Sequence, residues 1–402
     1  MTPDPVPGAR ADLDADLFNY RSLLDDDERA LLDRLRSWLE TNLAPRADEQ
    51  WAKAQFPHDL IAGFGALNVV GLPYELPGTP TEGRLLSGFV SLEISRIDAS
   101  FSSFYGVHSG LAMGSIYYCG SDEQRERWLP AMRRLEKIGA FGLTEPHGGS
   151  DVAGGLETTA RREGDQWLLD GAKRWIGNGT FADVVVIWAR DIEDDSVKGF
   201  VVEKGTPGFT ATKMENKLAL RTVQNADLLL EGVRVPEANR LHNDHTSGTF
   251  SDTNAVLRHT RGGVAWSSVG AMMAVYEIAA QYAKDRVQFG RPIGGFQLVQ
   301  DLLARMLGNI TASLGMAVRV AQLQDQGIFR DEQGALAKSF ATSRLRETVS
   351  WARELLGGNG ILLEYGIARF FNDAEALYSF EGTREINTLI VGRSITGLGA
   401  FT

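Results

Sequence analysis

The stretch "ETTARREGDQWLLDG" (157–171) contains two short extended runs on either side of a Gly-Asp step. That pattern is typical of a β-hairpin. "ADVVVIWAR" (182–190) and "KGFVVEKG" (198–205) continue the style, because both are rich in β-branched residues and bounded by turn formers. Strands joined by short turns, without intervening helices, predict a small antiparallel barrel or sandwich in the middle of the chain.

Helical patterns precede this region. Apolar residues recur at helical spacing over 31–43, and Asp25 with Glu28 forms a capping-type start just before them. The segment "GSDEQRERWLP" (120–130) begins with a capping box, and we expect its helix to stop near Pro130. The first third of the chain is therefore predicted to be helical.

Helical patterns return at about residue 255. The segments 296–327 and 336–360 are long amphipathic stretches, and the second ends in "GGNG" (357–360), which suits a left-handed C-cap. The predicted fold class is α+β, mainly α. We expect an N-terminal arm, a helical domain, a central β-domain and a second helical domain, with the bounds 1–20, 21–137, 138–247 and 248–402.

Bulk composition narrows the class of protein. The chain has 402 residues, 43% of them hydrophobic, with a net charge of −11 and a pI near 5.2. An acidic chain without a dense Lys/Arg run is not expected to bind nucleic acid or anionic membrane surfaces. One cysteine, Cys119, excludes an internal disulfide framework. Neither a signal peptide nor an uninterrupted membrane-spanning stretch is evident, so we expect a cytoplasmic protein.

Several common chemistries lack their motifs. The sequence has no Gly-Lys-Ser/Thr phosphate loop, no G-x-G-x-x-G between a strand and a helix, and no G-x-S-x-G elbow. His242 and His245 lie in a loop-like run without an obvious third ligand, so no metal site is expected.

The segment "ALYSFEGTREINTLIVGR" (376–393) places Glu381 at the mouth of a helix that we expect to begin near Thr383. The simplest interpretation is a helix start, because negative charge is favoured at a helix N-terminus and Thr383 can cap. The alternative is a general base in apolar surroundings, since Tyr378 and Phe380 could exclude water from the carboxylate and raise its pKa.

Three further segments need an explanation: "FGLTEPHGGSD" (141–151), "KRWIGNGTFAD" (173–183) and "DRVQFGRPIGGFQ" (285–297). The simplest structural interpretations are a polar interdomain loop, a tryptophan that plugs the end of a barrel, and a helix–helix turn with a solvated arginine.

Together these segments resemble the acyl-CoA dehydrogenase and oxidase flavoprotein superfamily, because "LTEPHGGSD", "RVQFGRPIGGFQ", "ELLGGNG" and "SFEGT" occur in the family's order and spacing. "FGLTEP" and "GRSITG" resemble glutaryl-CoA dehydrogenases, whereas "KRWIGN", "VQNADLLL" and "RIDAS" resemble plant peroxisomal short-chain acyl-CoA oxidases. The resemblance implies a helical domain, a β-domain and a C-terminal four-helix bundle. It also implies a homotetramer, a dimer of dimers, with one FAD per subunit and a role in fatty-acid β-oxidation.

By this resemblance Glu381 is the catalytic base. It would take the α-proton of an acyl-CoA while flavin N5 takes a hydride from the β-carbon, which gives a trans-2-enoyl-CoA. The thioester oxygen would be held by the Glu381 backbone N–H and a ribityl hydroxyl. Some family members carry the base on an earlier helix, but the matching stretch "RHTRGG" (258–263) has no carboxylate.

The resemblance also assigns binding residues. Flavin contacts would come from Phe141, Leu143, Thr144, Gly149, Ser150, Trp175, Ile176 and Gly177. Contacts to the pyrophosphate and adenine of a neighbouring subunit's FAD would come from Arg286, Gln288, Phe289, Gln297, Glu354 and Gly358, and adenylate contacts within the subunit from Thr383 and Glu385. Substrate contacts would come from Ser102, Ser150, Arg261, Glu381 and Gly382, with Arg261 near the CoA phosphates. Gly177 departs from the family, because many members have Ser or Thr there.

The sequence leaves more than one acyl-CoA substrate and more than one electron acceptor open. Glutaryl-specific members pair the distal carboxylate with an arginine whose position corresponds to Ser102, so glutaryl-CoA is not expected. Phe101, Phe104 and Tyr105 either shorten an acyl pocket, which favours short chains, or are ordinary helix packing. The leading interpretation is a dehydrogenase with electron-transferring flavoprotein as acceptor. An acyl-CoA oxidase and a non-catalytic flavin- or CoA-binding assembly protein are the alternatives.

Overall fold

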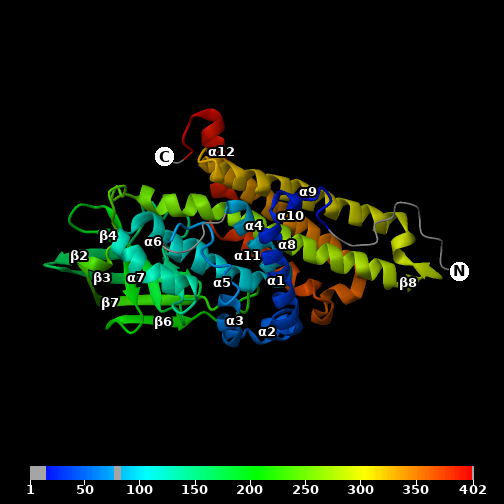
Figure 1. Ribbon diagram of the computed structural model, residues 1–402, viewed down its shortest axis with the longest axis horizontal. Coiled ribbons are helices and arrows are strands. Elements are labelled where there is room, and N and C mark those ends of the chain that lie inside the picture. Colours follow the sequence, from blue (N-terminus) through cyan, green and yellow to red (C-terminus); the bar gives the residue numbers. More distant parts are fainter. Residues whose placement is uncertain (1–14, 77–82, 401–402) are drawn as a thin grey trace.

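Strands gather at one end of an elongated, mostly helical molecule, and a bundle of long helices forms the other end (Figure 1). The computed structural model describes residues 15–76 and 83–400. Along the chain the elements change from helices to strands and back to helices, in the predicted order. Of the expected N-terminal arm, residues 1–14 lie outside the described residues, and Tyr20–Leu23 form a 3-10 turn (η1).

The N-terminal region is helical, as predicted. The Asp25–Glu28 capping box starts α1 and the Ser121–Gln124 box starts α7. The helices are α1 (Asp26–Asn42), α2 (Ala47–Lys53), α3 (Ile61–Gly65), α4 (Arg84–Ile97), α5 (Ala99–Tyr105), a π-helix (Gly106–Ala112), α6 (Met113–Cys119) and α7 (Asp122–Arg133), with 3-10 turns at Ala44–Arg46 and His58–Leu60.

The predicted stop at Pro130 is wrong. α7 continues through Pro130 to Arg133, because Trp128, Leu129 and Met132 are buried around the proline and tertiary packing outweighs its unfavourable helix propensity.

Seven strands form one sheet in the middle of the chain. They are β1 (Gly139–Gly142), β2 (Thr159–Glu163), β3 (Gln166–Ile176), β4 (Val184–Asp191), β5 (Val197–Glu203), β6 (Phe209–Lys213) and β7 (Ala226–Pro236), in the order β1-β4-β2-β3-β7-β6 with β5 also paired to β4. The β2–β3 hairpin is confirmed, with Glu163 opposite Gln166 across the Gly-Asp turn.

The prediction of a wholly antiparallel domain needs correction. β1 and β2 both pair with β4 in parallel, while the remaining pairs are antiparallel. Parallel neighbours need long connections rather than tight turns. Residues 143–183 join β1 to β4 and residues 164–183 join β2 to β4, and the first segment contains the polar run that the sequence singled out.

The C-terminal helices begin earlier than expected. α8 (Phe250–Asp285) starts five residues before the predicted return of helix, and α10 (Asp331–Leu355) likewise precedes 336. Gly357 has a φ of 59° and lies just past the end of α10, as expected for a left-handed cap. The remaining elements are β8 (Val287–Gln288), β9 (Arg291–Pro292), α9 (Gln297–Asp325), α11 (Ile367–Ser379) and α12 (Arg384–Thr396), with 3-10 turns at Glu237–Asn239, Ile293–Gly295, Gly357–Ile361 and Leu363–Tyr365.

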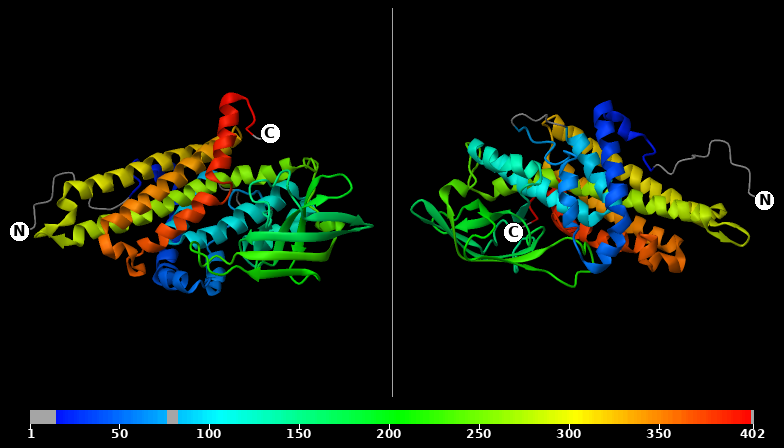
Figure 2. Two further views of the ribbon diagram at one scale, coloured as in Figure 1. Left: turned by 180° about the vertical axis from the view of Figure 1, so that it is seen from behind. Right: turned by 60° about the horizontal axis from the view of Figure 1, so that its bottom comes forward.

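α8 is the central helix of the molecule. It packs against α4, α9 and α10, while α12 projects from the bundle (Figure 2). By length and composition α8 is the one helix among the described residues that could cross a membrane, but 72% of its most apolar window is buried inside the protein. Such burial is typical of a core helix.

One carboxylate of α11 joins three parts of the fold. Asp373 Oδ1 accepts hydrogen bonds from the indole N–H of Trp51 in α2 (2.8 Å) and from the backbone N–H of Leu220, which precedes β7 (2.6 Å). Asp373 is buried, and burial together with the nearby Asp98 raises its pKa to about 7. This side chain therefore links the N-terminal helices, the β-region and the C-terminal bundle.

We expect Asp373→Ala to lower the unfolding free energy by about 1–3 kcal/mol, because two buried donors lose their acceptor. Asp373→Asn is the matched control, since it keeps one acceptor oxygen and removes only the charge. Melting temperatures of the two variants and the wild type measure the effect. Equal melting of the alanine and asparagine variants would contradict the assignment of the loss to the acceptor.

Candidate active site

Glu381 lies in a sharp turn between two helices. α11 ends at Ser379 and α12 begins at Arg384, and both Glu381 (φ 57°) and Gly382 (φ 82°) have left-handed backbone conformations. A non-glycine residue in this region costs about 1–2 kcal/mol, so its surroundings must hold it there. The hydroxyl of Thr383 accepts a hydrogen bond from the N–H of Ile386, which confirms the predicted helix start.

The Glu381 carboxylate is held by residues far away in the sequence. The hydroxyl of Thr260, on α8, donates to Glu381 Oε2 at 2.8 Å. Burial raises the pKa of the carboxyl group, and this shift is opposed by the Thr260 hydrogen bond and by the positive charges of Arg261 and Lys338. A carboxylate with a raised pKa, ready to take a proton, is what a general base requires.

The prediction that Tyr378 and Phe380 shield the Glu381 carboxylate from water was wrong. Phe380 is 36% exposed, and the ring of Tyr378 packs against the guanidinium of Arg346 at 4.5 Å. The recorded polar neighbours of the carboxylate come from α8 and α10 instead. The bundle helices, rather than the sequence neighbours of Glu381, therefore supply the environment of the carboxylate.

Arg261 is buried beside the base with spare hydrogen-bonding capacity. Its exposed fraction is 6%, and its Nε and Nη1 have no partner among the described residues, while Nη2 reaches only Asn254 at 3.5 Å. An arginine with unpaired buried donors is able to accept an anionic or polar ligand group.

The predicted flavin loop is anchored by a buried ion pair. Lys173 Nζ donates to Glu145 Oε1 at 2.7 Å and to the carbonyl of Leu143 at 3.2 Å, and both side chains are fully buried. Glu145 also accepts hydrogen bonds from the N–H groups of Glu157 and Thr158. Phe141 and Leu143 are buried, Thr144 is half-buried, and Gly149 and Ser150 are exposed.

The second predicted flavin loop lies against the first. The N–H of Arg174 donates to the carbonyl of Thr144 at 2.8 Å. Trp175 has a φ of 66° and its side chain is 54% exposed, whereas the following residue, Ile176, is buried. The interpretation of Trp175 as a barrel plug is therefore wrong. Its exposed ring, at the C-terminal end of β3, is available to a planar ligand.

The glycine at 177 has a steric explanation. A Cβ at Gly177 would come within 2.9 Å of Cγ2 of Val107, in the π-helix, which is closer than such contacts allow. The same π-helix reaches the base, since a Cβ at Gly110 would lie 3.4 Å from Cγ2 of Thr260. π-Helical turns often occur at functional sites. Here the turn lies between the second flavin loop and the residue that holds Glu381.

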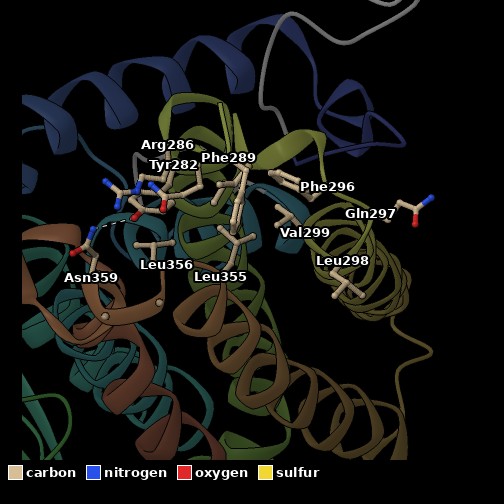
Figure 3. Close-up of a pocket in the computed structure, with 14 residues that line it drawn as sticks. Tyr282, Arg286, Phe289, Phe296, Gln297, Leu298, Val299, Leu355, Leu356 and Asn359 are labelled. Atoms are coloured by element: carbon tan, nitrogen blue, oxygen red, sulfur yellow. Dashed lines mark hydrogen bonds between the residues drawn. The ribbon is translucent and has the colours of Figure 1, made fainter. Parts of the chain in front are cut away.

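α8 ends at the far tip of the bundle, next to β8 (Figure 1), and a separate hollow lies there (Figure 3). Its volume is about 670 Å³, and five of the predicted residues line it: Arg286, Gln288, Phe289, Gln297 and Gly358. Phe289 is 93% exposed at a positive φ of 53°, in the turn of the β8–β9 hairpin. Glu354 is exposed but does not line the hollow.

The tip and the base are far apart within one chain. Thr260 and Arg286 both lie along α8, about 26 residues apart, which corresponds to about 39 Å of helix. The structure therefore divides the predicted cofactor residues between two places. Thr383 lies next to the base as the N-cap of α12, and Glu385 is exposed and paired with Arg384.

The predicted substrate residue Ser102 lies inside the fold. Its hydroxyl is 3.0 Å from that of Ser267 on α8, and its exposed fraction is 4%. Phe101 and Phe104 pack against Phe56 in a buried aromatic cluster. Of the two sequence interpretations of these aromatics, the structure favours packing.

Comparison with known proteins identifies the family. Sequence models of the N-terminal, middle and C-terminal domains of acyl-CoA dehydrogenases match residues 25–136, 140–233 and 248–396. The chain belongs to the acyl-CoA dehydrogenase family. Members of this family are oxidoreductases that act on CH–CH groups.

Three relatives match this chain over nearly its whole length. An acyl-CoA dehydrogenase of Bacillus subtilis is 34% identical over 90% of this chain and 96% of its own. A glutaryl-CoA dehydrogenase of Mycobacterium smegmatis, solved in complex with FADH2, is 36% identical with a TM-score of 0.92, covering 96% of this chain and 98% of its own. Butyryl-CoA dehydrogenase of Megasphaera elsdenii is 30% identical with a TM-score of 0.88, covering 92% and 98%.

Sequence reasoning missed three residues around the base of this acyl-CoA dehydrogenase: Thr260, Lys338 and Asn387. In "RHTRGG" (258–263) the sequence pointed to Arg261 and to the lack of a carboxylate, but not to Thr260, whose hydroxyl binds Glu381. Lys338 was detectable as a lysine on the apolar face of a predicted helix, where a charge is unexpected.

We expect Gly177→Ser to destabilise this protein by about 1–3 kcal/mol, because the new side chain collides with Val107. Val107→Ala makes room, so the double variant should melt at a higher temperature than Gly177→Ser alone. The four melting temperatures form a double-mutant cycle, and strictly additive effects would argue against the contact.

Proposed function

We propose that this acyl-CoA dehydrogenase oxidises a short-chain acyl-CoA to the trans-2-enoyl-CoA, with Glu381 as the catalytic base. The observation that supports this most is the partly buried Glu381 carboxylate, whose pKa is raised and which Thr260 orients. A solvated helix-start carboxylate would need neither the strained backbone nor the charged residues gathered around it.

Glu381 takes the α-proton of the acyl thioester. Thr260 fixes the orientation of the carboxylate, and burial raises its pKa and so makes it more basic. The Glu381 N–H has no recorded acceptor within residues 15–76 and 83–400, so it is free to donate to the thioester oxygen and stabilise developing negative charge. Arg261 offers two unpaired donors to a polar part of the substrate.

FAD is the cofactor, and bound FAD supplies the hydride acceptor for the β-carbon. The residues present fit such a group. Trp175 exposes its ring beside the flavin loop, the Lys173–Glu145 pair orders that loop, and the tip hollow combines the arginine Arg286 with the exposed ring of Phe289. Arginine suits diphosphate and an aromatic ring suits a nucleobase.

A homotetramer is part of the proposal. The tip hollow lies at the end of α8, about 39 Å of helix from Thr260, and β8 at this tip is at the opposite end of the molecule from β2 and β3 (Figure 1). A second copy that brings its tip to the first copy's flavin loops would join the two sets of predicted contacts.

The substrate proposed is a short monocarboxylic acyl-CoA. Ser102 stands where a distal carboxylate would need a cation, and its hydroxyl is occupied by Ser267. A buried carboxylate without a cation is costly. Electron-transferring flavoprotein is the proposed acceptor, and the single cysteine and acidic charge support a cytoplasmic location.

The test is an anaerobic titration of the flavin-loaded protein with butyryl-CoA, followed by the visible absorption of oxidised flavin. Wild type should bleach, and Glu381→Gln should bleach at least about 10²-fold more slowly, because it keeps the shape and loses the base. Glutaryl-CoA is the matched substrate control and should bleach more slowly. Equal rates for wild type and Glu381→Gln would contradict the role of Glu381. Admission of air afterwards separates a dehydrogenase from an oxidase.

Activity should fall as the pH is lowered through the raised pKa of Glu381, because only the ionised carboxylate accepts a proton. Thr260→Val removes a hydrogen bond that lowers this pKa, so the acidic limb of kcat/KM should move to higher pH. Loss of one hydrogen bond of about 1 kcal/mol corresponds to about a fivefold lower kcat/KM on that limb. An unmoved limb would show that Thr260 does not contact the working base.

A further inference from the structure

A lysine with no ion-pair partner is buried beneath the turn that carries Glu381. Lys338 lies on α10, has an exposed fraction of 0%, and forms no ion pair with a carboxylate in the described part of the chain. Burial lowers its pKa to about 8. Since an unpaired buried charge is strongly unfavourable, such a lysine is expected only where its hydrogen bonds or its field serve a purpose.

The Lys338 ammonium donates two hydrogen bonds, one to the chain before Glu381 and one to the chain after it. Lys338 Nζ donates to the carbonyl of Tyr378 at 2.8 Å and to the carbonyl of Gly382 at 2.8 Å. The first carbonyl lies at the end of α11, where no further helical N–H can reach it, and the second immediately precedes the N-cap of α12. One ammonium therefore ties together the chain on the two sides of Glu381.

Asn387 forms a second pair of hydrogen bonds to the same turn, from α12. The Asn387 amide donates to the carbonyl of Gly382 at 2.8 Å and to that of Thr383 at 3.0 Å. The Gly382 carbonyl thus accepts from both Lys338 and Asn387. With its flanking carbonyls fixed, the peptide of Glu381 can rotate little, and this keeps its strained left-handed backbone in place.

The charge of Lys338 also acts on the base. The charged groups that face the Glu381 carboxylate are Arg261 from α8 and Lys338 from α10, and Glu385 from α12 lies within the field of Lys338. Both cations favour the ionised form of Glu381 and so oppose the effect of burial. Position and charge of the base therefore depend on the same side chain.

We propose that Lys338 is the positioning residue of the catalytic base: it fixes the turn that aims the Glu381 carboxylate and backbone N–H, and it places a positive charge near the carboxylate. This inference rests on the proposed function of Glu381. Lys338 itself contacts neither the carboxylate oxygens nor any predicted cofactor residue in the recorded hydrogen bonds, so it acts through the turn.

The chain contains a matched control lysine. Lys217, before β7, donates to the carbonyls of Leu220 and Val223 and to the side chain of Asn225, and burial lowers its pKa to about 8 as well. It is thus another lysine that clamps backbone carbonyls, half-buried and with a similar pKa. Nothing connects it to Glu381, so Lys217→Met measures what loss of such a clamp does to stability alone.

The test compares flavin-loaded wild type, Lys338→Met, Lys338→Arg, Lys217→Met and Glu381→Gln with butyryl-CoA. For Lys338→Met we expect kcat per flavin to fall about 10²-fold with KM little changed, the effect of misplacing a reacting group by about 1 Å. The acidic limb of kcat/KM should move to higher pH, because a cation that favours the carboxylate is gone. Lys338→Arg keeps charge and donors and should recover part of kcat, and Lys217→Met should retain kcat.

The outcomes separate the two claims. If wild type turns over and Glu381→Gln does not, the proposed function stands and Lys338 is judged alone. Full kcat in Lys338→Met overturns the positioning role. So does a loss of kcat in Lys338→Met that leaves the acidic limb unmoved and is no larger than the loss in Lys217→Met. Should Lys338→Met fail to fold with flavin, Lys338→Gln, which keeps one amide donor, is judged by the same criteria. If wild type and Glu381→Gln behave alike, the proposed function fails and the inference fails with it.

Discussion

The arrangement of the molecule depends on one rigid element, the unbroken 36-residue helix α8. At 1.5 Å per residue it is about 54 Å long, and it packs against α4, α9 and α10 along its course. Its first half supplies Thr260 and Arg261 to the base, and its end presents Arg286 to the tip hollow. Because a buried helix cannot bend to bring these ends together, the distribution of predicted contacts over two distant places is built into the fold.

A balance of buried charges sets the chemistry of Glu381. Burial favours the neutral, protonated carboxyl group, which cannot act as a base. Thr260, Arg261 and Lys338 each favour the ionised form, and none of them forms an ion pair with it at contact distance. A direct ion pair would hold the carboxylate too tightly charged to accept a proton. Positive charge near it, but outside contact, leaves the base ionised and reactive.

The π-helix at Gly106–Ala112 connects the two halves of the site. Val107 fills the space beside Gly177 in the second flavin loop, and Gly110 approaches Thr260, which holds the base. Many family members have Ser or Thr at position 177. Glycine there removes a hydroxyl, and it also leaves room for Val107. A side chain at 177 and the side chain at 107 compete for the same volume, so the two positions constrain each other.

The sequence by itself determined the order of helices and strands, the β2–β3 hairpin, the helix caps at Asp25, Ser121 and Thr383, and the resemblance that led to Glu381, because each of these depends on residues close together in the chain. Only the tertiary structure decided that β1 and β2 run parallel to β4 and that α7 passes through Pro130. It also decided that Trp175 is exposed, that Thr260 binds the Glu381 carboxylate, and that Lys338 binds the turn that carries it. Those features arise from contacts between segments more than 30 residues apart or from burial against them. Local periodicity records which face of a helix is apolar, but it does not record which distant segment that face will meet.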